Sequence, residues 1–201
     1  TVYYKVTAPN HGEKSGSFTV VIGKAALTVT AKNKSITYGD VAANDGVEYS
    51  GFVNGETTSV LGGTLTYAYK VSGTTTDYTT SSPVGTYDII PSGLTSDNYE
   101  ITFVKGTLTV GAKAITKPTA VSKTYTYTGT KQTFELTGFD ANTMTISGNT
   151  QTNANESGYT VTVTPKENYV WSTEGDCAFS WKIGKAALTA TAAPSPTSAV
   201  G

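Results

Sequence analysis

Residues 23–28 read Gly-Lys-Ala-Ala-Leu-Thr, and the same six residues return at 184–189. A looser copy, Gly-Ala-Lys-Ala-Ile-Thr, stands between them at 111–116. Each copy lies next to stretches in which apolar and polar residues alternate, the pattern of a β-strand with one buried face. The spacing of the copies fits two small β domains of unequal length joined by short linkers.

The repeated phrase marks the joints between modules. Residues 18–27 match 179–188 in register, and 188–192 copy 27–31, which we interpret as the opening strand of the first complete module. The expected organisation is the last strands of a preceding truncated module at 1–22, complete modules at 23–111 and 112–184, and the start of a following truncated module at 185–201. Linkers this short predict a semi-rigid rod rather than a flexible tether.

Composition favours strands. Threonine is abundant, tyrosine (13) outnumbers phenylalanine (6), and the chain has one methionine and no arginine. Branched and aromatic side chains suit a half-buried pleated surface. We therefore predict an all-β chain of tandem small β-sandwich or β-grasp-like modules arranged as a rod. One short helix is allowed at 54–61 in the first module, where Asn54 could cap it.

Alternation places the individual strands. In the first module they are expected at 27–31, 35–38, 47–52, 64–70, 87–90 and 99–110, and in the second at 120–121, 125–127, 133–136, 143–147, 159–164, 169–172 and 177–183. The stretch 99–110 is broken at Lys105-Gly106, and we interpret it as a half-buried hairpin with Tyr99, Ile101 and Phe103 on one face.

Charge argues against nucleic acid and membrane partners. All 14 cations are lysines, which lack the bidentate fork of arginine, and the net charge is −1. No apolar run approaches the roughly 18 residues that a membrane span requires. We expect no nucleic-acid partner and no membrane contact from this segment.

Residue types also argue against catalysis. His11, the one histidine, stands in a Pro-Asn-His-Gly turn, and a lone loop histidine is more often solvated than catalytic or metal-bound. The glutamates show no pairing in sequence, so a solvated strand face explains them better than a glycosidase site. We expect no enzyme and no catalytic, cofactor-binding or metal-binding residue.

Several conspicuous residues have structural interpretations. Cys177 shares a face with Phe179, Trp181 and Ile183, which predicts a small core residue rather than a reactive thiol. Residues 155–161 resemble a tyrosine corner that pins a loop through Tyr159. Tyrosine pairs two residues apart, at 67 and 69 and at 125 and 127, could stack on sugar rings, but the core edge or a module interface is the more common place for them.

The first module resembles the bacterial MBG domain of the YGX type. The resemblance covers nearly all of 24–110 and rests on Lys-Ala-Ala-Leu-Thr-Val-Thr-Ala at 24–31, Ile-Thr-Tyr-Gly-Asp at 36–40, Gly-Phe-Val-Asn-Gly-Glu-Thr at 51–57, Val-Gly-Thr-Tyr-Asp-Ile at 84–89, Gly-Leu at 93–94, Asn-Tyr-Glu-Ile-Thr-Phe at 98–103 and Gly-Thr-Leu-Thr-Val at 106–110. It implies an exported, cell-surface location and supplies no catalytic residue.

The second module resembles the Ig-like repeats that accompany such domains in bacterial surface adhesins, through Tyr-Thr-Gly at 127–129, Met-Thr-Ile-Ser-Gly at 144–148, Gly-Tyr-Thr-Val-Thr-Val at 158–163, Asn-Tyr-Val-Trp at 168–171 and Trp181. Together the resemblances imply a stalk segment of an extracellular adhesin whose partners are its neighbouring modules and, weakly, mucin or host glycans. The alternatives are a dedicated carbohydrate-binding module, an accessory segment of a larger extracellular enzyme, and a surface protein that self-associates into filaments.

Overall fold

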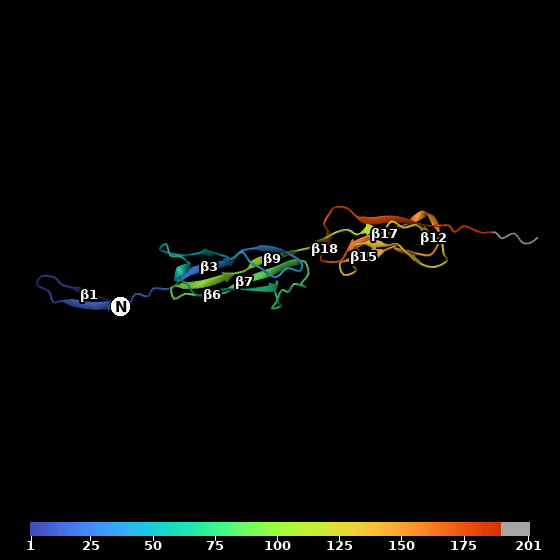
Figure 1. The fold of residues 1–201 in the computed structure, drawn as a ribbon. Coiled ribbons are helices and arrows are strands. Elements are labelled where there is room, and N and C mark those ends of the chain that lie inside the picture. The colour runs from blue at the N-terminus through green and yellow to red at the C-terminus, as the bar shows by residue number, and fades with distance from the viewer. Residues whose placement is uncertain (190–201) are drawn as a thin grey trace, which may run out of the picture. The chain divides into compact units, whose positions relative to one another are not determined.

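The computed structural model describes residues 1–189, and this part of the chain is built from β-strands with one short 3-10 turn (Figure 1). The all-β fold class is confirmed. The chain divides into two compact units between Gly111 and Ala112. The predicted opening strand of a following module falls partly at 190–201, outside the described residues, and 185–189 adopt no regular secondary structure.

A two-stranded hairpin forms at residues 1–22. Strand β1 (Val2–Val6) pairs antiparallel with β2 (Lys14–Phe18), so that Val2 lies opposite Phe18 and Tyr4 lies opposite Gly16. No residue of this hairpin is buried. The turn between its strands carries Asn10 in the left-handed conformation, at φ 62°.

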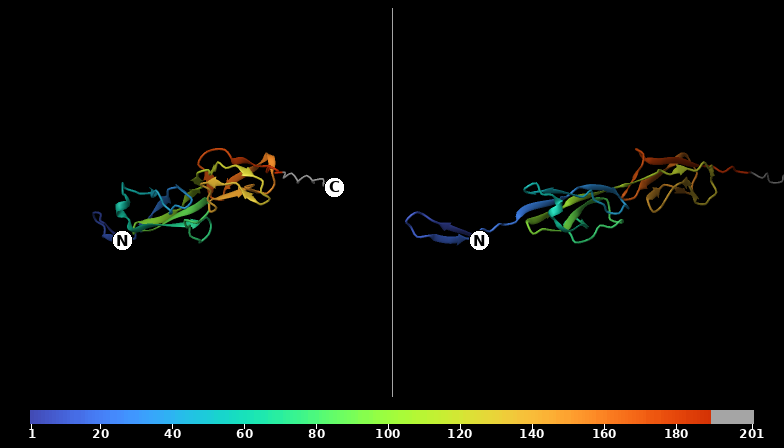
Figure 2. Two further views of the ribbon diagram at one scale, coloured as in Figure 1. Left: turned by 45° about the vertical axis from the view of Figure 1, so that its right-hand side comes forward. Right: turned by 60° about the vertical axis from the view of Figure 1, so that its left-hand side comes forward.

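The first module consists of two sheets (Figures 1 and 2). The strands are β3 (Ala25–Ala31), β4 (Lys34–Thr37), β5 (Val47–Ser50), β6 (Gly62–Val71), β7 (Gly85–Thr95), β8 (Tyr99–Val104) and β9 (Gly106–Gly111). One sheet has the order β5-β3-β8 and the other has the order β4-β9-β7-β6. The pairs β3–β8 and β4–β9 are parallel, and the rest are antiparallel.

Alternation along each strand builds the core of the first module. In β9 every second residue is buried, and Leu108 and Val110 point inward from it. β3 contributes Leu27 and Val29 in the same way. The fully or nearly fully buried apolar set is Leu27, Val29, Ala31, Tyr78, Tyr87, Ile89, Tyr99, Leu108 and Val110. The inward faces that period-two alternation predicted are therefore confirmed.

One sequence-based prediction for the first module is wrong. The stretch 99–110 is not a hairpin, because β8 pairs with β3 in one sheet while β9 pairs with β4 and β7 in the other. The chain changes sheets at Lys105-Gly106. The short helix that the sequence allowed at 54–61 is only the 3-10 turn η1 (Thr58–Val60), and Asn54 takes a left-handed conformation instead of capping it.

The second module contains a four-stranded sheet of order β12-β19-β17-β15 and three two-stranded pairs. Its strands are β10 (Lys113–Ile115), β11 (Thr119–Ala120), β12 (Tyr125–Thr126), β13 (Gln132–Thr133), β14 (Leu136–Thr137), β15 (Met144–Ser147), β16 (Thr150–Gln151), β17 (Asn155–Pro165), β18 (Tyr169–Trp171) and β19 (Cys177–Gly184). The smaller pairs are β10–β18, β11–β14 and β13–β16. β10 and β16 were not anticipated. The single strand expected at 133–136 is wrong, because β13 and β14 are separate strands that pair with β16 and β11.

Aromatic rings fill the core of the second module. Trp181 is 5% exposed and contacts the rings of Tyr125 and Phe134, with centroid distances of 4.9 and 5.7 Å. Val161 and Ile183, each fully buried, complete the inner face of the large sheet. Edge-to-face and tilted aromatic pairs add to what their buried area contributes.

The two modules share one arrangement of strands. The sheets β4-β9-β7-β6 and β12-β19-β17-β15 have the same order, with a parallel first pair and antiparallel second and third pairs. The opening strand of each module also runs parallel to a strand that directly follows an asparagine, β3 to β8 after Asn98 and β10 to β18 after Asn168. The Asn98 carbonyl accepts the Ala25 N–H, and the Asn168 carbonyl accepts the Lys113 N–H, both at 2.9 Å. The second module is thus a shorter version of the same plan.

Candidate functional site

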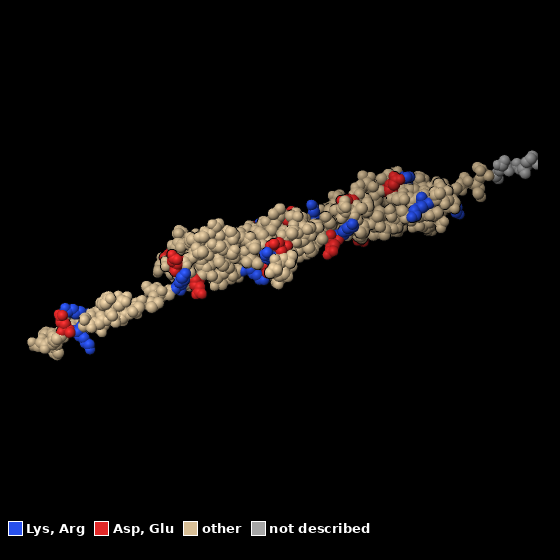
Figure 3. All heavy atoms as spheres, turned by 90° about the horizontal axis from the view of Figure 1, so that it is seen from below, with Lys and Arg blue, Asp and Glu red and all other residues tan. Residues whose placement is uncertain are grey.

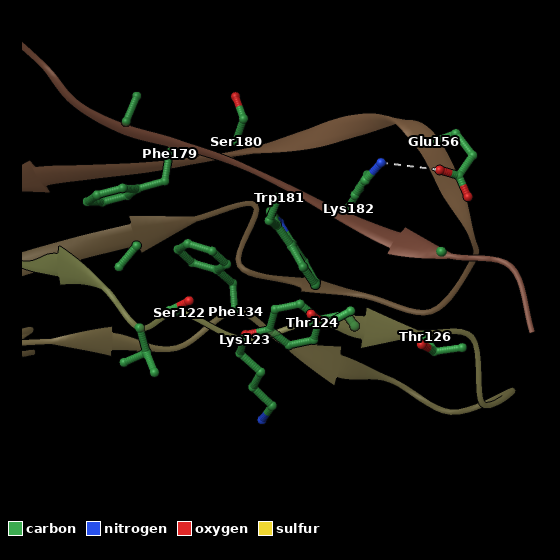
Figure 4. A pocket seen from close by; sticks show the side chains of 15 residues that line it. Ser122, Lys123, Thr124, Thr126, Phe134, Glu156, Phe179, Ser180, Trp181 and Lys182 are labelled. Carbon is green, nitrogen blue, oxygen red and sulfur yellow. Dashed lines mark hydrogen bonds and ion pairs between the residues drawn. The ribbon is translucent and has the colours of Figure 1, made fainter.

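A groove of about 750 Å³ crosses the second module between β19 and the segment 120–126 (Figure 4). Its floor is aromatic, from Tyr125, Phe134, Phe179 and Trp181, and its rim is polar, from Ser122, Lys123, Thr124, Glu156, Ser180 and Lys182. An apolar floor with a few polar rim groups is the general form of a binding groove.

The groove exists because β12 covers only one end of β19. The parallel ladder between the two strands has two residue pairs, Tyr125 with Ile183 and Thr126 with Gly184. From Cys177 to Trp181, β19 pairs with β17 on its other side. This part of β19 is a strand edge inside a groove, and such an edge can accept an added extended segment.

The rim carries both signs of charge. Lys182 Nζ lies 3.5 Å from Glu156 Oε2, as drawn in Figure 4, and Lys123 forms an ion pair with Glu135. The hydrogen bond to the Glu135 carboxylate raises the pKa of Lys123 above its usual value. All four side chains are between 46% and 64% exposed. The pairs therefore contribute little to stability, and the rim carries no single-sign field.

The aromatic floor offers little surface to a sugar. Tyr125 and Trp181 are buried in the core, and Tyr67 and Tyr69 of the first module pack against its core as the core-edge interpretation predicted. Stacking on a sugar needs an exposed ring face. Tyr127, which is 42% exposed, is the better candidate; it lines a shallow site with Asn153, Ala154, Lys185, Ala186 and Leu188.

Candidate chemical groups are not assembled into a reactive cluster in the part of the chain that the structure describes. His11 is exposed in its turn, where Nδ1 lies 2.9 Å from the Pro9 carbonyl oxygen. Across residues 1–189 there is no group of three or more His, Cys, Asp or Glu side chains able to hold a metal ion. Within the same residues no helix is long and apolar enough to cross a membrane.

Cys177 lies in the core of the second module, beside Met144 and Val163. Burial raises the pKa of its thiol above the usual value, although Lys117 acts in the opposite direction. A raised pKa suppresses the thiolate, which is the reactive form. The prediction that Cys177 is a small core residue is confirmed.

Tyrosine corners pin a loop in each module. Tyr159 donates its hydroxyl to the Asn153 carbonyl at 2.9 Å, six residues upstream, which confirms the predicted corner. Tyr87 makes the equivalent bond to the Pro83 carbonyl at 2.6 Å. The two tyrosines occupy matching positions, opposite Trp181 and Leu108 of the neighbouring strands. The Gly-Thr-Tyr signal at 85–87 could have revealed the second corner.

Removing either hydroxyl should loosen its own module by a modest amount. Tyr159→Phe and Tyr87→Phe each delete one hydrogen bond and leave a loop carbonyl without that donor, which costs about 1 kcal/mol of unfolding free energy. Urea titrations of the two variants should lower the midpoint of the mutated module alone. Equal shifts in both modules, or none, would show that the corners do not hold their loops.

A second contact brings together two segments that carry the family resemblance. The Tyr99 hydroxyl donates to Glu56 Oε2 at 2.5 Å and accepts the Val53 N–H at 3.1 Å. Its bond to the Glu56 carboxylate raises the pKa of Tyr99 above its usual value. The glutamate of the 51–57 segment and the tyrosine of the 98–103 segment therefore lock a loop to the opening of β8 and serve the fold.

Surface charge is sparse and mixed. On the face that Figure 3 shows, lysines and acidic residues lie scattered singly or in opposite-sign groups. Ion pairs such as Lys70 with Asp77 and Lys105 with Asp88 neutralise many of them locally. A strongly basic surface, which phosphate binding would need, is not present on this face.

Comparison with known proteins bears on the first module. No curated protein matches the chain. The family comparison leaves the second module unidentified. Residues 27–109, which run from β3 into β9, match the model of the MBG domain (YGX type), and the first module is an MBG domain of that type.

Proposed function

We propose that this chain is a non-catalytic repeat segment of a bacterial cell-surface protein, and that its modules act as a semi-rigid extracellular stalk. MBG domains are non-catalytic structural modules that occur in bacterial surface proteins. The observation that carries the stalk is the joint: β9 ends at Gly111 and β10 begins at Lys113, which leaves Ala112 alone between the strands of two modules. One residue gives a joint few torsions about which to bend.

The shared strand plan supports the same role. A stalk needs many copies of a unit that folds by itself and passes the chain on at a defined point. In both modules the opening strand runs parallel to the strand that follows Asn98 or Asn168. The closing strand, β9 or β19, ends at a glycine, Gly111 or Gly184. In each module the buried side chains form the core, and the tyrosine hydroxyl of the corner holds a loop.

Weak binding of mucin or host glycans along the modules is the adhesive part of the proposal. Its support is Tyr127, a half-exposed ring beside the amide of Asn153 and the ammonium of Lys185, because sugars are bound by aromatic faces combined with polar side chains. The neighbouring Thr126 is exposed and lies outside this site.

Affinity chromatography on immobilised mucin tests the adhesive part. The intact chain should be retarded, and Tyr127→Ala should reduce the retardation severalfold because the ring supplies the stacking face. Thr126→Ala, a neighbouring exposed substitution, should leave it unchanged. If the intact chain passes without delay, the modules are spacers and the adhesive role is rejected.

A further inference from the structure

The hairpin at residues 1–22 has an apolar face that nothing in the described structure covers. Val2 and Tyr4 of β1 share this face with Phe18 of β2, and all three are about half exposed. The adjoining Val20 and Ile22 are also exposed, Ile22 at 92%. A two-stranded hairpin is marginally stable in water and gains stability by packing this face on further strands.

The register of the hairpin matches the closing strand pair of each module. Val2 lies opposite Phe18, Val161 lies opposite Phe179, and in the first module Ile89 lies opposite Gly106. Each second strand then reaches a glycine at the same spacing, at 23, 184 and 111. Lysine and alanine follow directly at 23 and 184, and after one inserted alanine at 111. The hairpin is the third copy of the pairs β7–β9 and β17–β19.

The residues of the second module that correspond to the exposed apolar residues of the hairpin are buried. The equivalents of Val20 and Ile22 are Trp181 and Ile183, which are 5% and 0% exposed. β19 continues as a strand to Gly184, and both β12 and the start of β17 pair with its end. β2 stops at Phe18, and no described strand pairs with residues 19–22.

We propose that the hairpin is the closing strand pair of a further module, and that its apolar face docks on a sandwich half like residues 112–159, supplied by an earlier part of the same polypeptide. Phe18 corresponds to Phe179 rather than to the glycine of the MBG domain, which identifies the second module's type. The turn agrees, since Asn10 and Asn168 both take left-handed conformations, at φ 62° and 73°. This interaction surface goes beyond the stalk role.

The docking face can be tested with the chain's own strands. A second copy of residues 112–159 is placed directly ahead of Thr1, which is the equivalent of Thr160. The added segment supplies the partners of both hairpin strands, so the amides of residues 20–22 should exchange with deuterium at least about a hundredfold more slowly than in the unextended chain. Hydrogen exchange followed by NMR measures this directly.

Two neighbouring substitutions distinguish docking of this face from nonspecific hydrophobic association. Ile22 corresponds to buried Ile183, whereas Val21 corresponds to exposed Lys182. In the extended chain Ile22→Asp should abolish the protection and Val21→Asp should preserve it. The proposal is overturned if the extended chain gains no protection, if both substitutions act alike, or if the unextended chain gains protection as its concentration rises, which would indicate a second copy as the partner.

Discussion

Replacing Trp181 with alanine should unfold most of the second module while the MBG domain stays intact. The ring is 5% exposed, contacts Tyr125, Phe134 and Tyr159, and donates its Nε1–H to the Gly148 carbonyl at 3.3 Å. Truncating a buried tryptophan costs about 3–5 kcal/mol. A single small core rarely supplies more than about that amount, so little stability would remain.

Tryptophan fluorescence reports this result cleanly. Trp171 and Trp181 are the two tryptophans of the chain, so in Trp181→Ala the remaining Trp171 reports on the second module. A urea titration should show the module largely unfolded without denaturant. The adjacent Lys182→Ala, on the exposed face of β19, should shift the free energy of unfolding by less than about 0.5 kcal/mol. A loss below about 1 kcal/mol for Trp181→Ala would contradict the assigned core.

Replacing Gly106 with alanine should strongly destabilise the MBG domain. This buried glycine begins β9, and a Cβ there would lie 2.5 Å from the Ala31 carbonyl oxygen and 2.8 Å from that of Lys32. Both obstacles are backbone atoms at the end of β3, so one strand has to move. Overpacking of this kind costs about 3 kcal/mol.

The same substitution at the other end of β9 is the matched control. At Gly111 the nearest atom to an added Cβ is the Ile36 carbonyl oxygen at 3.7 Å, an ordinary contact. Gly111→Ala should therefore be neutral or slightly stabilising, since alanine reduces the entropy of the unfolded chain. Calorimetry should show a lower melting temperature for Gly106→Ala in the MBG transition alone. Similar melting temperatures for the two variants would show that the close approach to β3 is not tight.

Much of the fold was predictable because alternation is a local signal. The inward residues of β9 and β19 and the core position of Cys177 follow from period two and the side-chain types alone. The spacing of Tyr159 from Val161 predicted a corner bond that the structure contains.

Strand partners were harder to predict because pairing depends on distant residues. The alternating pattern on either side of Lys105-Gly106 is the same whether the two strands pair with each other or enter different sheets. The close approach of Gly106 to the end of β3, at the point where the chain changes sheets, has no local signature. The parallel pairs β3–β8 and β4–β9 likewise join segments far apart in sequence.

The groove of the second module was also invisible to sequence reasoning. It arises because β12 diverges from β19 after two residue pairs. The point of divergence depends on the tertiary fold and is not encoded in the residue types of the two strands. Its lining residues, such as Lys123 and Ser180, carry no motif.

Small-angle X-ray scattering of the intact chain, compared with a variant carrying a Gly-Ser insertion after Ala112, tests the stalk most directly. If the one-residue joint is stiff, the intact chain should scatter as one elongated particle with a narrow range of sizes, and the insertion should broaden that range because flexible linkers behave as random coils. A compact particle, or an intact chain as freely jointed as the insertion variant, would contradict the account.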